Sequence, residues 1–438
     1  MKIIRTEKQT NSRLTEVMLK EGIEANIELK VNSQIDYQTH IGFGGAFTEA
    51  AATTFYNMSE ASQNKIIKKY FDPVEGLGYT MGRVSIHSCD FSLENYTYVE
   101  EGDQTLETFD ISREKKWVLP MISAAEKTAG TKLKILASPW SPPAYMKTNG
   151  NMNHGGSLLP DYESLWAAYY VKYIQKMKEE GIGIWGISVQ NEPAAVQVWD
   201  SCIYSAEEER NFVKNHLGPT LEKANLQHVN VVIWDHNRDL IVERADTVLS
   251  DEDARKYVWG TGNHWYVSEA FENLEKLHKL HPDKHILFTE GCQEGGPHPD
   301  SWETGERYGR NIIGDFNHFS EGWLDWNLVL NEQGGPNHVG NYCDAPILCY
   351  EEKDYVHLNS SYYYIGHFSK YIRPGAKRIH LQLDTCDSVY ATAFKNEDGS
   401  KVLVLMNEGE QVQGINFKVD EDRFVDSVPG RSITTYLI

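Results

Sequence analysis

Short apolar runs rich in β-branched and aromatic residues recur along the chain, separated by longer segments of mixed polarity. Eight such runs begin near residues 41, 79, 133, 183, 229, 257, 285 and 323. Each interval between them can hold a helix and its loops. Strands this apolar that alternate with helices are covered on both faces and form a parallel sheet. Eight strand–helix repeats predict a (β/α)8 TIM barrel, and a doubly wound sheet is the alternative.

Helix start signals lie in several of these intervals. Ser59 and Asp161 each precede a helical segment, and Ser205 and Glu208 have the spacing of a capping box. The segment SYYYIGHFSKYIRPG, at residues 361–375, predicts the last helix of the barrel, because its Pro-Gly end cannot continue a helix.

The two ends of the chain have a different pattern, in which apolar and polar residues alternate. This pattern predicts strands at residues 26–31, 378–383, 389–394, 401–407 and 432–438. We therefore expect a small antiparallel β-sandwich beside the barrel, built from both ends of the chain, and we interpret it as structural. The predicted division is 1–40 for its N-terminal strands, 41–373 for the catalytic TIM barrel and 374–438 for the remainder of the sandwich.

Charge and cysteine usage limit the partners and the compartment. The 438 residues include 42 Lys and Arg against 63 Asp and Glu, a formal net charge of −21. Such a surface repels nucleic acid and anionic membranes. No stretch approaches the ~18 apolar residues of a membrane span, so we expect no integral membrane contact. The first residues lack a signal-peptide pattern and the six cysteines are scattered, so a cytoplasmic location is the expectation. A homo-oligomer is left open.

Two glutamates stand where predicted strands end. Glu192 follows the fourth run and Glu290 ends the seventh. Pro193 favours an extended backbone at Glu192 and ends the strand there. A single strand-end glutamate is more often a solvated loop residue. Because TIM-barrel sites lie at the carboxyl ends of the strands, however, these two can face each other. Two opposed carboxylates are the minimum machinery of glycoside hydrolysis.

Seven motifs carry a resemblance that covers the chain from about residue 40 to its C-terminus. They read FGGAFTEAAA, GRVSIHSCDFS, SPWSPPAYMKTNG, NEP, NHWY, TEGC and GWLDWNLVLNEQGGPNHVGNYCDAPI. In this order they resemble glycoside hydrolase family 30, and most closely its glucosylceramidase branch. The resemblance implies a retaining β-glycosidase with a barrel and a side β-domain, acting on carbohydrate without a metal or other cofactor.

The resemblance also implies roles for individual residues. Glu192 matches the general acid/base and Glu290 the nucleophile. The positions that hold the sugar match Asp90, Trp140, Asn191, Trp326 and Asn341, and those that hydrogen-bond the catalytic carboxylates match His264 and Tyr266. We expect Arg83 to brace the barrel floor or a carboxylate. Each role suits the side chain, since amides and carboxylates bind hydroxyl groups and indoles pack against the C–H face of a sugar.

The implied mechanism is double displacement. Glu290 attacks the anomeric carbon while Glu192 protonates the leaving oxygen, and water activated by Glu192 then releases the sugar. Such chemistry needs a protonated Glu192, and we expect the adjacent charge of Glu290 and partial burial to raise its pKa. The leading substrate class is β-D-glucosides.

Several alternatives remain at this stage. The same chemistry on β-1,6-glucan, β-xylosides or β-fucosides stays open. A binding protein with a degenerate barrel would lack a catalytic carboxylate, and a metal-dependent hydrolase would need paired histidine ligands that the sequence does not show. The loop after Pro193 is short. Because this loop would border the leaving group of the substrate, the identity of the leaving group is the least defined part of the prediction. A cytoplasmic enzyme would meet a small β-glucoside or oligosaccharide.

Overall fold

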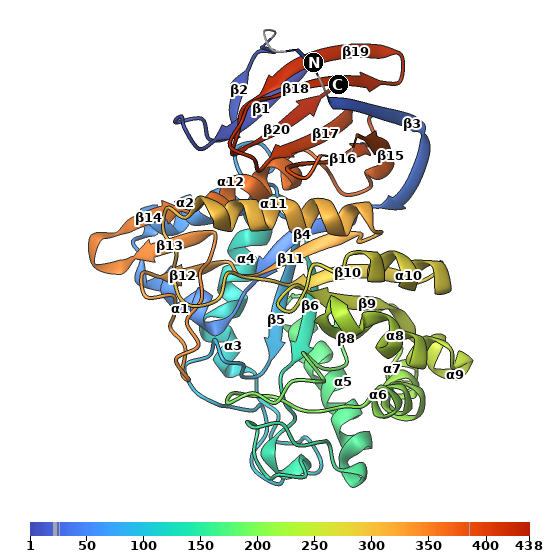
Figure 1. Cartoon of the computed structure of the whole chain (residues 1–438). Helices are drawn as coiled ribbons and strands as arrows, with labels where there is room; N and C mark the ends of the chain where they lie inside the picture. Colours follow the sequence, from blue (N-terminus) through green and yellow to red (C-terminus); the bar gives the residue numbers. More distant parts are fainter. Residues whose placement is uncertain (21–23, 26, 385) are drawn as a thin grey trace.

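Eight parallel strands close into a barrel in the computed structural model, which describes residues 1–20, 24–25, 27–384 and 386–438. They are β4 (Gly42–Ala46), β5 (Met81–Ile86), β6 (Lys134–Pro139), β7 (Ile184–Ser188), β8 (Asn230–Asn237), β9 (Val258–His264), β10 (His285–Glu290) and β11 (Gly322–Asn327). Each pairs with the next, and β11 pairs with β4 (Figure 1). The predicted TIM barrel is therefore confirmed.

Helices surround the barrel strands. They are α1 (Glu49–Asn57), α2 (Glu60–Phe71), α3 (Ser112–Lys116), α4 (Val118–Ala129), α5 (Glu163–Glu179), α6 (Ala206–Phe212), α7 (Gly218–Lys223), α8 (Ile241–Leu249), α9 (Glu252–Arg255), α10 (Glu272–Leu280), α11 (Trp302–Asn317) and α12 (Ser360–Ser369), with a π-helical turn at Val213–Leu217. Short 3-10 turns occupy Ala144–Met146, Pro160–Tyr162, Arg238–Leu240 and Glu351–Lys353. Among the described residues, no helix combines the length and the apolar character needed to span a bilayer.

The helix caps follow the sequence in two cases out of three. Ser59 caps α2 by accepting a hydrogen bond from the Ser62 amide. Ser205 and Glu208 form both bonds of the capping box at the start of α6. Asp161, by contrast, lies within a 3-10 turn before α5, and no side chain caps that helix. Pro160 begins the turn, so the helix starts after the residue that the pattern favoured as its cap.

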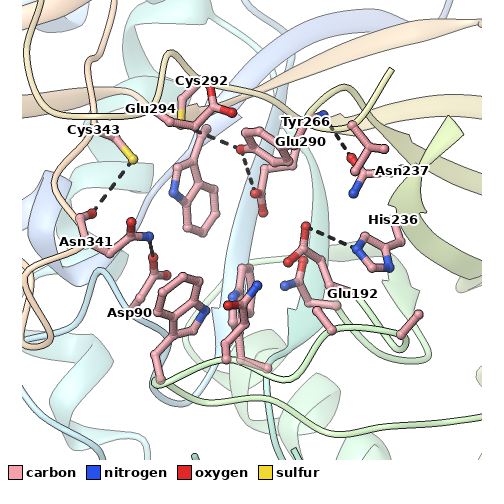
Figure 2. A pocket seen from close by; sticks show the side chains of 18 residues that line it. Asp90, Glu192, His236, Asn237, Tyr266, Glu290, Cys292, Glu294, Asn341 and Cys343 are labelled. Carbon is pink, nitrogen blue, oxygen red and sulfur yellow. Dashed lines mark hydrogen bonds and ion pairs between the residues drawn. The ribbon is translucent and has the colours of Figure 1, made fainter. Parts of the chain in front are cut away.

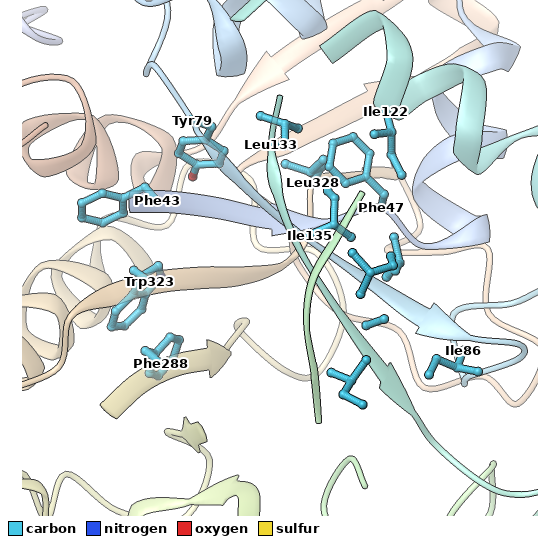
Figure 3. Packing of buried hydrophobic residues seen from close by; sticks show 14 of the residues in the cluster. Phe43, Phe47, Tyr79, Ile86, Ile122, Leu133, Ile135, Phe288, Trp323 and Leu328 are labelled. Atoms are coloured by element: carbon cyan, nitrogen blue, oxygen red, sulfur yellow. The ribbon is translucent and has the colours of Figure 1, made fainter. Parts of the chain in front are cut away.

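Two apolar layers hold the barrel. Inside it, Met81, Leu136, Val232, Leu287 and Leu324 form one buried cluster. Outside it, aromatic and aliphatic side chains pack between strands and helices, with Phe288 of β10 stacked on Trp323 of β11 at 3.5 Å between ring centroids (Figure 3). Leucine-to-alanine changes in cores of this kind cost about 2–5 kcal/mol of unfolding free energy. The strand ends that carry the polar residues are therefore fixed by packing on both sides.

A nine-stranded sheet forms the second domain. Its order is β19 (Asp422–Val428), β18 (Gln413–Val419), β3 (Ile27–Thr39), β15 (Lys377–Leu383), β16 (Val389–Lys395), β17 (Lys401–Asn407), β20 (Ser432–Leu437), β1 (Lys2–Glu7) and β2 (Thr15–Val17). Phe417 of β18 packs on Tyr436 of β20 although four strands separate them in this order, so the sheet curls over itself as a sandwich. The strand predicted from residue 26 is described from Ile27 onward, and Asn26 lies outside the described residues.

The sandwich departs from the expectation in one pairing. Strand β18 runs parallel to β3, whereas all other neighbours in this sheet are antiparallel. A parallel neighbour needs a long connection, which the barrel itself supplies because β3 precedes it and β18 follows it. Three N-terminal strands, β1 to β3, join this domain, and both chain ends lie in it (Figure 1).

Helices α11 and α12 connect the two domains. Buried His367 of α12 contacts the hydroxyl groups of Thr435 and Thr6 at 2.8 and 2.9 Å. Arg431 donates two hydrogen bonds, each 2.6 Å long, to Glu306 of α11. A small sheet of β12 (Val329–Asn331), β13 (Ile347–Tyr350) and β14 (Tyr355–Leu358) follows the last barrel strand.

Candidate active site

A cavity of about 450 Å³ opens at the carboxyl ends of the barrel strands. Eight of the nine predicted site residues line it: Asp90, Trp140, Asn191, Glu192, Tyr266, Glu290, Trp326 and Asn341. Figure 2 shows the side chains of Asp90, Glu192, Tyr266, Glu290 and Asn341 around this cavity. The ninth, His264, is fully buried behind the cavity wall and contacts Glu192 from there. The topology thus brings all nine together, from six barrel strands or the loops that follow them and, for Asn341, from the segment beyond the last barrel strand.

The two catalytic candidates lie close together. A carboxyl oxygen of Glu192, one of Glu290 and a ring nitrogen of His264 all lie within 4.8 Å of one another. Retaining glycosidases hold their two carboxyl groups about 5–5.5 Å apart, whereas inverting enzymes leave about 6.5–9.5 Å for a water molecule. The spacing of Glu192 and Glu290 is that of a retaining enzyme.

Glu192 has a left-handed backbone, with φ of 49°. The expected extended conformation is therefore wrong. Its amide donates to the Asp235 carbonyl at 3.0 Å, and its carbonyl accepts from the Ala195 amide at 2.9 Å. These bonds fix a conformation that costs roughly 1–3 kcal/mol for a residue with a side chain. The strained turn aims the carboxylate across the barrel towards Glu290.

Glu290 is surrounded by donors. Tyr266 donates from its hydroxyl group to Oε1 at 2.9 Å, and Arg83 forms an ion pair with Oε2. Burial raises the pKa of Glu290, while the charges of His264 and Arg83 and the Tyr266 hydrogen bond oppose that rise. The pKa of Glu290 stays above its usual value, but both donors bond more strongly to a carboxylate than to a carboxylic acid, so these contacts favour the anionic form that a nucleophile requires.

Glu192 is held by two histidines. Nδ1 of His264 lies 3.1 Å and Nε2 of His236 lies 3.7 Å from its Oε1. Burial acts to raise the pKa of Glu192, but His236 and His264 bring it below its usual value. The expected raised pKa is therefore wrong for the free site.

The proton in this part of the site resides on His264. Burial by itself lowers its pKa, but the charge of Glu290 and the bonds to Asp235 and Glu192 raise it to about 9. Nε2 of His264 lies 3.0 Å from Asp235 Oδ1, and Nδ1 faces Glu192. The proton that an acid catalyst needs is thus held one hydrogen bond away from Glu192.

Arg83 joins the two halves of the site, as its expected bracing role implies. Its guanidinium donates to Asn191 Oδ1 at 2.8 Å and to Asp235 Oδ2 at 2.9 Å, besides pairing with Glu290. Since Oδ1 of Asn191 is used in this way, its Nδ2 remains as a donor for a substrate hydroxyl group.

Asp235 and His236 were not among the residues predicted from the sequence. The backbone of β8 turns left-handed at Trp234 and Asp235, with φ of 67° and 47°, where the strand register shifts. Buried Glu209 of α6 accepts a 2.8 Å hydrogen bond from the Trp234 amide and so holds this distortion. The polar cluster Asp-His-Asn at the end of the fifth apolar run was the available signal.

The sugar-binding candidates form the opposite wall. Asn341 Nδ2 donates to Asp90 Oδ2 at 2.9 Å. Burial raises the pKa of Asp90 to about 8, so at neutral pH its carboxyl group is mainly protonated and can also donate to a hydroxyl group. Trp140 and Trp326 stack at 5.2 Å between centroids, and the Arg83 guanidinium lies 4.9 Å from the Trp140 ring. Both indoles are therefore held rigidly where they meet the cavity.

The outer wall of the cavity is less polar. It includes Ala194, Ala195, Trp199 and Val267 beside the polar Gln197, and Val267 is 64 % exposed. The loop after Glu192 and the one after β9 supply these residues. The entrance therefore offers apolar contacts beyond the carboxylates.

The close group of Glu192, His264 and Glu290 has the donor atoms of a metal site. In this structure, however, the three groups already interact with each other or with Arg83. A cation placed there would compete with the guanidinium for Glu290. The residues present suit acid–base chemistry better than metal binding.

Comparisons with known proteins agree with the fold and the site. Residues 40–372 match the profile "Glycosyl hydrolase family 30 TIM-barrel domain" and residues 375–436 match "Glycosyl hydrolase family 30 beta sandwich domain". The chain is similar to the lysosomal acid glucosylceramidase of Mus musculus, with 34% identity over 93% of this chain and 83% of that protein. Two solved structures cover the whole chain and 99% of their own: SrfJ from Salmonella typhimurium, at 35% identity and TM-score 0.94, and the endo-β1,6-glucanase BT3312, at 30% and 0.90.

Proposed function

Since this chain belongs to glycosyl hydrolase family 30 and is a glycoside hydrolase, we propose that it cleaves β-D-glucosides by double displacement, with Glu290 as nucleophile and Glu192 as acid/base. The observation that carries the assignment is the close pair of carboxylates, of which Glu290 is paired with Arg83 and Glu192 with two histidines. Glu290 is therefore kept as an anion, and Glu192 is kept close to the proton on His264.

The first step forms a glycosyl–enzyme ester. A carboxylate oxygen of Glu290 bonds to the anomeric carbon as the bond to the leaving oxygen breaks. The leaving oxygen takes a proton from Glu192, to which His264 passes it through their 3.1 Å contact, so Glu192 is a carboxylate and His264 is neutral once the leaving group has departed. Tyr266 orients the Glu290 carboxylate through the hydrogen bond that its hydroxyl group donates to Oε1.

The second step returns the enzyme to its starting state. Glu192, now a carboxylate, removes a proton from a water molecule whose oxygen attacks the anomeric carbon and releases Glu290. Esterification removes the negative charge of Glu290, which is the leading influence that raises the pKa of His264. With that charge gone, the pKa of the Glu192–His264 pair falls after the sugar is bound covalently, so Glu192 is present as the carboxylate that takes the proton from water.

A β-1,6-glucan is the second candidate substrate. The whole chain superposes on a structure described as an endo-β1,6-glucanase with a TM-score of 0.90, so the backbone that frames the cavity is shared with that protein. The apolar outer wall of Ala194, Ala195, Trp199 and Val267 supports a leaving group with an apolar face, such as an aryl or alkyl group or the C–H face of a second sugar.

We also propose a cytoplasmic location. The support is the state of the six cysteines, which are all free thiols and five of which are buried. Free thiols are typical of reducing compartments. Cell fractionation would test this location, and recovery of the protein from the culture medium would contradict it.

The test of function is a panel of aryl β-glycosides (glucoside, xyloside, fucoside and galactoside) and a β-1,6-linked glucan, with wild type beside Glu290→Gln. We expect β-glucoside turnover that falls by at least about 1,000-fold in the variant, since losing the nucleophile removes several kcal/mol of barrier lowering. Glu294→Gln is the matched control, because Glu294 also lines the cavity but pairs with Arg307. Equal rates in wild type and Glu290→Gln would refute the nucleophile.

Azide distinguishes the two carboxylates. With an activated aryl glucoside, azide should replace water in Glu192→Ala and give a β-glucosyl azide, because two inversions still occur. In Glu290→Ala it should attack directly and give the α-azide. The opposite products would exchange the two roles.

A further inference from the structure

Two cysteines that the hydrolytic mechanism does not use line the active-site cavity. Cys292 follows Glu290 by two residues, and Cys343 follows Asn341 by two. Each side chain is only 3% exposed, and that exposure is into the cavity. Figure 2 shows both sulfur atoms at the same end of the cavity, beside Tyr266 and Asn341.

The two thiols belong to segments that run side by side. Cys343 is bridged to Glu294 in antiparallel fashion, and the Asp344 amide donates to the Gln293 carbonyl at 2.9 Å. Cys292 stands two residues before Glu294, so Cys292 and Cys343 are diagonal neighbours across this bridge. The thiol of Cys343 is the leading influence on the pKa of Cys292, which it raises.

Diagonal placement argues against a disulfide and for a bridging ion. Diagonal neighbours in an antiparallel pair have Cα atoms about 7–8 Å apart. A disulfide usually requires about 4.4–6.8 Å. An ion between the sulfur atoms adds two metal–sulfur bonds of about 2.3 Å and so spans the longer gap.

Each thiol is coupled to a different part of the hydrolytic site. The Cys292 sulfur lies 3.6 Å from the Tyr266 hydroxyl oxygen, which donates to Glu290. The Cys343 thiol contacts the Asn341 carbonyl at 3.8 Å, and Asn341 holds Asp90. A change at this pair therefore reaches both the nucleophile and the sugar-binding wall.

We propose that Cys292 and Cys343 form a binding site for a soft divalent cation that accepts two-coordination, of the Hg²⁺ class, and that its occupation stops hydrolysis. Both S–H bonds break, two sulfur–metal bonds form and two protons pass to water, with no change in oxidation state. The Tyr266 hydroxyl group would then face a metal-bound sulfur instead of donating to Glu290 alone.

Charge and ligand number select this class of ion. The neighbouring Cys343 thiol and burial raise the pKa of Cys292 well above its usual value, so Cys292 rests as a thiol and reacts slowly with alkylating reagents or peroxide. A soft ion overcomes this by displacing the protons. Two thiolates neutralise a divalent ion, whereas a monovalent ion would leave a net negative charge beside Glu290. Zn²⁺ usually takes four protein ligands. Within the described residues, the one cluster of three close metal-ligand candidates is Glu192, His264 and Glu290, so the two cysteines lack the further ligands that Zn²⁺ would need.

The experiment titrates the full-length protein with HgCl₂ and follows two signals that do not depend on turnover. These are the ultraviolet charge-transfer absorbance of mercury–thiolate bonds and the protons released into weak buffer. The background is Cys386→Ser, because Cys386 is the one cysteine that is not fully buried and it lies in the sandwich. Within that background, Cys343→Val and Cys292→Ser each remove one ligand.

We expect one tightly bound ion, two protons released and hydrolysis lost in parallel with binding. Cys343→Val should weaken binding beyond the roughly 10–100-fold loss that changes around a metal's ligands usually cause. A dithiol chelator should restore activity and both titratable thiols.

Three results would overturn the proposal. Unchanged affinity in both single variants would place the ion elsewhere. Binding without proton release would exclude thiolate ligands. Failure to recover both thiols after chelation would mean oxidation instead of coordination. Because absorbance and proton release are measured without substrate, a protein that failed to hydrolyse β-glucosides would still give a decisive answer.

Discussion

Arg83 and Asp235 form an ion pair of 2.9 Å beneath the cavity, and neither side chain is exposed to solvent. Each member of the pair also contacts one catalytic carboxylate, directly or through a histidine. Arg83 forms an ion pair with Glu290, and Asp235 contacts His264, which in turn contacts Glu192. The two catalytic carboxylates are therefore positioned by one buried cation and one buried anion.

Replacing Arg83 by lysine should damage both activity and stability. Lysine keeps the charge but cannot reach Glu290, Asn191 and Asp235 together. We expect kcat/KM to fall by about 100-fold or more and the free energy of unfolding by about 3–5 kcal/mol, the usual consequence of breaking a buried pair. Steady-state kinetics and thermal unfolding measure the two effects. Arg373→Lys, in an exposed pair with Asp398, is the control, and an equal response there would contradict the argument.

Removing the Tyr266 hydroxyl group should shift the acidic side of the pH–rate profile. The hydroxyl group donates to Glu290 and lowers the pKa of that carboxyl group, so Tyr266→Phe raises it. A higher pKa keeps Glu290 protonated to higher pH, and the acidic limb of kcat/KM should move upward with a loss of about 10-fold at the optimum. Tyr145→Phe, half-buried and bonded to the Asp103 carbonyl, should leave the limb unmoved. A profile identical to wild type would argue against this contact.

His236 should affect the ionisation of Glu192 and not that of Glu290. Its ring nitrogen lies 3.7 Å from Glu192, and in its charged form it lowers the pKa of that carboxyl group. Burial lowers the pKa of His236 itself, so this charge is present only on the acidic side of the profile. In His236→Asn, Glu192 should keep its proton to higher pH, so the limb of kcat/KM that reports Glu192 moves upward. The limb that reports Glu290 should stay in place. Movement of both limbs together would show a general disturbance of the site instead.

Asp325 predicts how stability depends on pH. Burial raises the pKa of this carboxyl group to about 8, against an ordinary value of 3.8. The folded state therefore binds the proton more tightly than the unfolded chain, so this group's contribution is fully present at low pH and is lost as pH rises from about 4 to about 8. Asp325→Asn, which keeps an acceptor for the Tyr308 hydroxyl group, should reduce the fall in Tm between pH 5 and pH 8.5 by roughly 5 °C. Asp161→Asn, at an exposed position, should not.

Much of the fold could be predicted because short local runs of apolar residues mark the barrel strands. The eight apolar runs correspond to β4–β11, and the strand-end positions of Glu192 and Glu290 follow from that register. What local pattern could not supply were features set by distant contacts. The parallel pairing of β18 with β3 depends on two strands separated by the whole barrel.

The site shows the same limit. Asp235 faces the barrel only because β8 turns left-handed at Trp234, and Glu209 from another helix holds that turn. The pattern of apolar residues in the fifth run does not predict this left-handed turn. In the same way, the pKa of Glu192 depends on His236 and His264, which reach it from neighbouring strands. Residue types predicted the reaction class, whereas protonation depends on the assembled surroundings.

The interleaving of both chain ends in the sandwich sets an order for synthesis. Lys2 pairs with Leu437, so the first strand leaves the ribosome long before its partner exists. At about 5–20 residues per second, β1 to β3 wait for tens of seconds while the barrel strands emerge. During that time the edges of β3 have neither β15 nor β18 beside them. In the nascent chain β3 is therefore an unpaired strand until the barrel is made, and removal of residues 432–438 would leave β1 and β17 without the neighbour they share.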